Sequence, residues 1–131
     1  MSNLQYTALQ IREAAILTNS YVAANTLWLD DNNRSQELNQ SVLLVDITLW
    51  SLTSVELKIE YSDDWVNFYQ QTFIDVSWGT ATATAWEYTF GTDGSYEIAN
   101  PFKCKFIKVS VKGTGTVTGS SCAIKGIIWI A

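Results

Sequence analysis

Six aspartates are the side chains of this chain that come nearest to catalytic chemistry. The sequence contains no histidine, so the commonest general base and the commonest metal ligand are both missing. A glycosidase needs two carboxylates that face one another across a cleft, whereas adjacent acids in a strand turn point apart. No glycine-rich phosphate loop or serine-hydrolase motif is present. We therefore expect no catalytic site and no cofactor. The carboxylates that could have served as catalytic acids are those of Asp30, Asp31, Asp46, Asp63, Asp64 and Asp75.

Asp46 stands apart from the other acids because of its neighbours. On an alternating strand it shares the even-numbered face with Leu44, Thr48 and Trp50. A carboxylate beside a tryptophan is typical of sugar-binding sites. The same pair also fits an anchor in a protein interface, or an ordinary sheet surface, and the sequence leaves these three interpretations open.

Two features resemble binding sites for metals or for sulfur chemistry. Asp30-Asp31-Asn32-Asn33 has oxygen ligands suited to Ca²⁺, but it lacks the D-x-D-x-D-G spacing, so a solvated turn is favoured. Cys104 and Cys122 are the only cysteines. If residues 113–120 close a simple hairpin, Lys112 opposes Ser121 and the two cysteines lie about 20 Å apart, too far for a disulfide. Two free cysteines, in a chain made in a reducing cytoplasm, are expected.

Aromatic residues are more numerous than a core of this size requires. The 131 residues include six Trp, six Tyr and five Phe, while only 16% of residues are charged. Some of these rings must lie at the surface, where they give large contact area to a partner. The expected interface or glycan contacts are Trp50, Asp46, Trp65, Trp78, Trp86, Lys108 and Lys112.

Charge is distributed unevenly along the chain. All thirteen acids lie in residues 1–102 beside three basic residues (3 − 13 = −10), and residues 103–131 hold five lysines and no acid (+5). The basic segment could face nucleic acid, an anionic glycan or an acidic subunit, or it could protect an exposed sheet edge. Because the rest of the molecule would repel a polyanion, we expect no nucleic acid. No run of about 18 apolar residues is present, and no membrane span is expected.

Strand patterns dominate the sequence. Leu43–Leu49 is apolar at each odd position, and Val55–Tyr61 alternates apolar residues with charged ones, as half-buried strands do. Further strands are expected over residues 65–74, 86–90, 102–111 and 121–130, with a loop or thin edge strand over residues 80–85. Eight or nine strands without a helix predict an all-β, single-domain β-sandwich over residues 1–131, with a jelly roll as the favoured connection. Residues 1–25 are expected to form an extended N-terminal arm.

The chain resembles the small β-sandwich virion proteins of tailed bacteriophages, which include capsid decoration and head or tail accessory proteins. The similar features are Arg12 and Thr18-Asn19-Ser20 in the arm, Asp46-Ile47-Thr48, and a final hairpin of Phe106–Val111 with Ala123–Ile130. This resemblance implies a non-enzymatic decoration or cement protein that binds the major capsid protein or other virion proteins. It also implies a homo-oligomer, with a trimer favoured, located in the virion. A tail or head-completion protein is the near alternative.

A second resemblance is to the galactose-binding-like jelly rolls of carbohydrate-binding modules. In those modules a strand leads into Ser-Asp-Asp-Gly-x-x-Trp, and here Tyr61–Phe68 is similar. Trp65 replaces the glycine and Phe68 the tryptophan, which keeps the turn chemistry but weakens the sugar site. This resemblance implies a module that adheres to host glycans.

Overall fold

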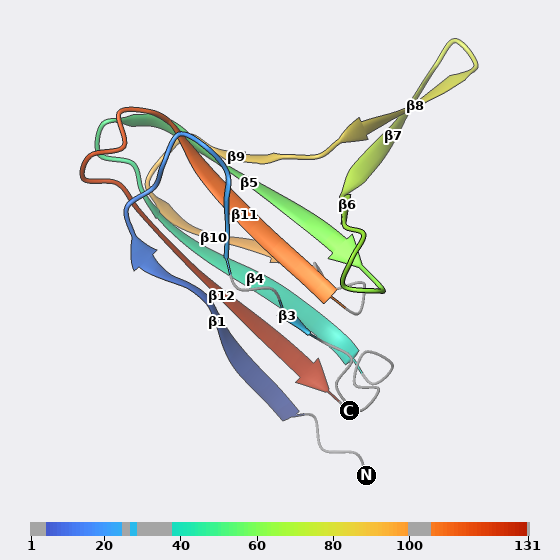
Figure 1. Ribbon diagram of the computed structural model, residues 1–131, viewed down its shortest axis with the longest axis horizontal. Helices are drawn as coiled ribbons and strands as arrows, with labels where there is room; N and C mark the ends of the chain where they lie inside the picture. The colour runs from blue at the N-terminus through green and yellow to red at the C-terminus, as the bar shows by residue number, and fades with distance from the viewer. Residues whose placement is uncertain (1–4, 25–26, 29–37, 100–105, 131) are drawn as a thin grey trace.

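The computed structural model describes residues 5–24, 27–28, 38–99 and 106–130, with backbone alone at 5–7, 27–28, 38–40 and 128–130. All regular structure in these ranges is β-strand, and no helix long and apolar enough to cross a membrane occurs among them. Two sheets pack face to face, and a third, two-stranded unit projects from them (Figure 1). The strands are β1 (Gln5–Ala15), β2 (Val22–Ala23), β3 (Leu27–Trp28), β4 (Leu38–Thr48), β5 (Leu52–Ser62), β6 (Tyr69–Gln70), β7 (Thr72–Ser77), β8 (Thr80–Ala85), β9 (Tyr88–Phe90), β10 (Gly94–Ala99), β11 (Phe106–Gly115) and β12 (Ser121–Ile130).

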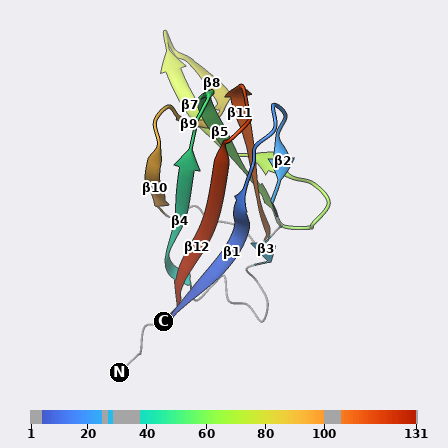
Figure 2. The same ribbon diagram turned by 90° about the vertical axis from the view of Figure 1, so that its left-hand side faces the viewer.

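The strand order is that of a jelly roll. One sheet runs β1-β12-β4-β10, and the other runs β2-β11-β5-β6. Because β3 pairs with β11 and β9 pairs with β5, the second sheet also has four strand positions, two of them interrupted. Figure 2 shows the first sheet in front of the second. When the eight strand positions are numbered along the chain, the first sheet has the order 1-8-3-6 and the second has the order 2-7-4-5. This is the double Greek key of a jelly roll, the connection that the sequence favoured.

The core lies between the two sheets and follows the predicted alternation. The odd-numbered side chains from Leu43 to Ile47 in β4, from Val55 to Ile59 in β5 and from Ile107 to Val111 in β11 are buried, while most of the even-numbered side chains between them are more exposed. Residues of β12 complete the same cluster from the first sheet. Burying this apolar area supplies the main driving force for folding. The most deeply buried side chains are Leu43, Val45, Val55, Leu57, Ile59, Ile107, Val109, Val111, Cys122 and Ile124.

The N-terminal stretch is extended, as expected, but its described part is an edge strand of the first sheet. β1 pairs antiparallel with β12 and bulges between Gln10 and Ala15. At this bulge the Arg12 guanidinium donates hydrogen bonds to the carbonyls of Ala15, Ile16 and Cys122. Arg12 therefore fixes the point where the chain leaves the first sheet for the second.

The segment after β1 is tied to the end of β11. The Gly113 N–H donates to the Thr18 carbonyl at 2.7 Å, and the Asn19 amide donates to the carbonyls of Gly113 and Gly115, each at 2.9 Å. The Arg and Thr-x-Ser features noted in the sequence thus hold the crossover between the sheets.

Two strand predictions are wrong. β11 and β12 do not form a hairpin, because β11 pairs with β5 in one sheet and β12 pairs with β4 and β1 in the other. The Gly- and Thr-rich segment after β11 carries the chain across the sandwich, so the register used to place the cysteines does not exist. Residues 65–74 are also not one strand: Trp65–Phe68 is a loop, followed by the short β6 and the start of β7.

β7 and β8 are an insertion within one strand of the sandwich. In an antiparallel pair, the numbers of two opposed residues have a constant sum. This sum is 130 where β6 pairs with β5 (Glu60 with Gln70) and 145 where β9 pairs with β5 (Leu57 with Tyr88). The difference, 145 − 130, means that fifteen residues interrupt a strand that would otherwise run continuously along β5. The jelly roll is complete without them, and they leave it as the projecting hairpin of Figure 1.

Candidate interaction surface

The inserted hairpin has one apolar face and one polar face, and both are exposed. Every residue of β7 and β8 is exposed, and among the described strands the two pair only with each other. Directly opposed residues of an antiparallel pair lie on the same face. One face therefore carries Ile74, Val76, Ala81, Ala83 and Ala85 with Thr72, and the other carries Phe73, Asp75, Ser77, Thr80, Thr82 and Thr84.

Trp78 occupies the tip of the hairpin in a conformation that bulky residues avoid. Trp78 and Gly79 have φ angles of 53° and 78°, so they form a two-residue turn with both central residues left-handed. Such a type I′ turn favours Asn-Gly, and a non-glycine residue there costs about 1–2 kcal/mol. The Trp78 side chain is 100% exposed. No contact of the Trp78 ring with the described residues compensates this cost.

The base of the hairpin is held by aromatic and backbone contacts. The Trp86 ring meets the rings of Phe73 and Tyr88 edge-on, at centroid distances of 5.1 and 5.8 Å. The Trp86 N–H donates to the Gln71 carbonyl at 2.8 Å, and the Tyr88 hydroxyl donates to Oε1 of Gln71 at 3.1 Å. Phe73 and Trp86 remain 40% and 38% exposed, so this aromatic cluster also offers surface to a partner.

Trp65 lies in the turn that resembles carbohydrate-binding modules. Its φ angle is 68°, a left-handed conformation that favours glycine, the residue that Trp65 replaces in the resemblance. The Asp64 carboxylate accepts hydrogen bonds from the backbone N–H groups of Asn67 and Val66 and from the Asn67 side chain. These bonds, with one from Ser62, hold the pKa of Asp64 far below its usual range. The turn chemistry is thus kept, as expected.

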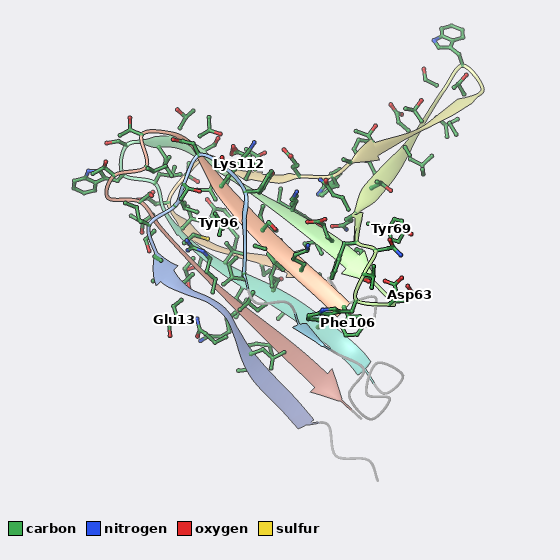
Figure 3. All side chains as sticks on the ribbon, viewed as in Figure 1. Glu13, Asp63, Tyr69, Tyr96, Phe106 and Lys112 are labelled. Atoms are coloured by element: carbon green, nitrogen blue, oxygen red, sulfur yellow. The ribbon has the colours of Figure 1, made fainter. Side chains whose placement is uncertain are left out.

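The Trp65 ring itself packs within the chain rather than around a hollow. It meets Phe106 edge-on at a centroid distance of 4.9 Å and Phe68 at 6.4 Å. The Lys108 ammonium lies 4.1 Å from the centre of the Phe68 ring. Figure 3 shows Phe106, Tyr69 and Asp63 at this same end of the sandwich, with Lys112 toward the other end of β11.

Lys112 belongs to a separate cluster on the outer face of the second sheet. The ammonium groups of Lys58 and Lys112 lie 4.6 and 4.8 Å from the centre of the Tyr21 ring. Burial, together with the nearby Glu87 and Glu56 carboxylates, raises the pKa of the Tyr21 hydroxyl. Lys108 and Lys112, the two lysines predicted from the sequence as contacts, therefore both lie over aromatic rings of their own chain.

Asp46 and Trp50 are not brought together into one site. Asp46 lies on the outer face of β4, as predicted, and accepts a hydrogen bond from the Ser95 hydroxyl. It lines a shallow hollow of about 380 Å³ together with Leu44, Ser95, Tyr96, Glu97 and Lys125, and Trp50 is not among these residues. Trp50, with φ 56°, lies in the β4–β5 turn against Gly119, where an added Cβ would approach the ring within 2.7 Å.

The structure describes one of the two cysteines and none of the residues of the candidate calcium-binding turn. Cys122 is a free, buried cysteine, and burial raises its thiol pKa to about 11. Cys104 and Asp30–Asn33 lie outside the described residues. Within the described ranges, no group of three or more His, Cys, Asp or Glu side chains could hold a metal ion.

No model of a protein family matches the chain, and no curated protein matches it, so the resemblance to phage virion proteins has no family match behind it. A solved structure from work titled "Bacillus endospore appendages form a novel family of disulfide-linked pili" is similar in fold, with a TM-score of 0.48 and 11% sequence identity. The similarity covers 99% of this chain and 91% of that one.

Proposed function

We propose that the chain is a non-enzymatic structural subunit of a larger protein assembly, and that the inserted β7–β8 hairpin is its assembly element. The observation that carries the proposal is the fifteen-residue insertion. It adds exposed apolar surface to a fold that is complete without it, and an isolated two-stranded hairpin is only marginally stable in water.

A capsid decoration protein of a tailed phage is the specific assignment that we propose. The sequence resemblance supports it, as does a rigid jelly roll with a projecting, nearly uncharged arm. Asp75 is the only charged residue in β7 and β8, so the hairpin can dock on protein without desolvating more than one charge. The acidic bulk of the chain also suits a position outside the shell, away from packaged DNA.

A deletion that restores the continuous strand tests this assignment. Removing residues 72–86 joins Gln71 to Glu87, which then faces Lys58 across the β5 pairing. We expect purified, undecorated capsids of the phage that carries the gene to co-sediment with the parent chain but not with the deletion variant. Equal binding of both chains would contradict the hairpin's role, and no binding of either would contradict the capsid assignment.

Carbohydrate binding is the second candidate, favoured by the hollow beside Asp46. There two carboxylates, Asp46 and Glu97, line the hollow together with Tyr96. A glycan array probed with the parent chain and with Asp46→Asn tests this candidate. If the hollow is a sugar site, the parent chain binds a glycan and the substitution removes that binding. Binding that survives the substitution would exclude the hollow as the site.

A further inference from the structure

The exposed edge of β8 lacks the features that normally prevent strand pairing. Sheet edges are usually protected by charges, proline, bulges or shortness. Thr80–Ala85 alternates threonine with alanine and contains no charge, no proline and no bulge, and its six residues pair on one side only. Its backbone groups on the other side are open to a further strand.

The other described edges carry such protection. β1 bulges twice and holds Arg12 and Glu13, β10 holds Glu97, and β7 holds Asp75. The remaining edge strands are two or three residues long. β8 is thus the one edge, among the strands that the structure describes, that is both long enough to pair and unprotected.

We propose that two copies of this chain pair through β8, antiparallel about a twofold axis, into a four-stranded sheet β7-β8-β8-β7. This inference rests on the proposed assembly role and names the partner as a second copy. The Thr/Ala alternation is self-complementary, because a twofold axis at Thr82 or at Ala83 places threonine opposite threonine and alanine opposite alanine. Both copies then present their apolar faces on the same side, and threonine pairs line the other side.

The same pairing gives the exposed tip tryptophan a partner. In an antiparallel pair the tip of one hairpin lies beside the base of the other. With Thr82 on the axis, Trp78 is level with the partner's Trp86, and with Ala83 on the axis it is level with the partner's Tyr88. Each Trp78 ring therefore reaches the half-exposed aromatic cluster of Phe73, Trp86 and Tyr88 in the other copy.

This arrangement explains why a bulky ring occupies a left-handed turn position. An Asn-Gly turn would close the same hairpin with less strain, but it would bring no aromatic surface to the partner. Buried tryptophans are among the residues that contribute most to interface affinity. The twofold pairing predicts a dimer rather than the trimer implied by the phage resemblance.

Single cysteines on the hairpin test the pairing. Thr82→Cys and Ala83→Cys are made separately, and Ser77→Cys on β7 is the matched control because it is equally exposed on the same hairpin. Under mild oxidation we expect one of the two β8 variants to form a covalent dimer at least tenfold faster than Ser77→Cys or the parent chain. Equal rates for the β7 and β8 variants would overturn the pairing.

A charge placed on the β8 edge separates this inference from the proposed function. We expect Thr82→Lys to weaken dimerisation at least tenfold, since two lysines would meet near the axis, while Ser77→Lys dimerises as the parent does. If Thr82→Lys leaves the oligomer intact but deletion of residues 72–86 dissolves it, the hairpin is the assembly element and the β8 pairing is wrong. If neither change affects assembly or capsid binding, both proposals are wrong.

Discussion

Three of the six tryptophans, Trp50, Trp65 and Trp78, have left-handed backbone conformations, and they differ in what their rings touch. Trp50 lies on Gly119 and Trp65 packs on Phe106, so contacts within the chain offset part of the strain. Trp78 is fully exposed and has no such contact with any part of the chain that the structure describes. Strain that the chain itself does not offset indicates a residue kept for an external contact.

Trp78→Asn separates folding from assembly. Asparagine tolerates the left-handed turn, so we expect the hairpin to become more stable by about 1 kcal/mol, or roughly fivefold in amide exchange protection, when both chains are compared as monomers at low concentration. We expect the same variant to dimerise more weakly. Trp78→Ala is the control, because it removes the ring and keeps the strain. A variant that loses exchange protection would show that the ring stabilises the turn itself.

Asp64 predicts a pH dependence of stability. Its pKa is lower in the folded chain than in the unfolded chain, where it is about 4, so its contribution is complete above that pH and is lost as the pH falls toward the folded value. Urea unfolding at pH 6 and pH 3 measures this. Asp64→Asn should lose less stability between the two pH values than the parent. Asp63→Asn, the neighbouring control, should behave as the parent does; equal slopes for all three chains would contradict the prediction.

Arg12 predicts a loss of stability at the β1 bulge. Arg12→Ala leaves the carbonyls of Ala15, Ile16 and Cys122 without their charged donor, and we expect the free energy of unfolding to fall by about 2–3 kcal/mol. Arg12→Lys keeps the charge but not the planar fork, so it should recover only part of the loss. Chemical denaturation of the three chains measures both values. An alanine variant as stable as the parent would show that water replaces the guanidinium.

At the scale of elements, the strands with strict alternation were predictable and the insertion was not. Leu43–Leu49 and Val55–Tyr61 carry their burial pattern in the sequence, because one face of each packs on the core. β6 and β9 are two and three residues long, too short for any periodic signal. Only the pairing register shows that they form one interrupted strand.

The β11–β12 connection shows a second limit of sequence reasoning. A Gly- and Thr-rich turn between two alternating strands fits a hairpin and a crossover equally well, since alternation reports which side chains are buried but not which strand is the neighbour. The same limit applies to the candidate contact residues, because spacing in the sequence does not show which side chains are neighbours in space. Trp78 and Trp86 were named separately as candidate contacts, and only the structure shows that both belong to the inserted segment. Asp46 and Trp50 were named as neighbours, but they are separated by a turn that no spacing rule indicates.

We predict that the sandwich still folds when residues 72–86, the inserted hairpin, are deleted. The deletion leaves the core untouched, since none of the removed side chains is buried. We expect the free energy of unfolding to change by less than about 1–2 kcal/mol, the size of the lost Trp86 contact with Tyr88. Thermal unfolding measures it. A variant that fails to fold would show that the hairpin is part of the folding unit and not an addition to it.

At the scale of the whole molecule, the protein is a jelly roll with one projecting arm, which we propose to be its contact element. Low charge content, exposed apolar residues on the arm and an unprotected β8 edge all favour association over a monomer in solution. The outer faces of the sandwich are different, because Lys58 and Lys108 lie over rings of the same chain and Asp46 accepts a hydrogen bond from a hydroxyl of the same chain.

Pairing through the hairpin is tested by the mass of the purified chain in solution, measured by light scattering after gel filtration. We expect the parent to have twice the 14.7 kDa of one chain, and the variant without residues 72–86 to be a folded monomer. A parent that stays monomeric at every concentration, or a deletion variant that keeps the parent's oligomeric state, would contradict pairing through the hairpin.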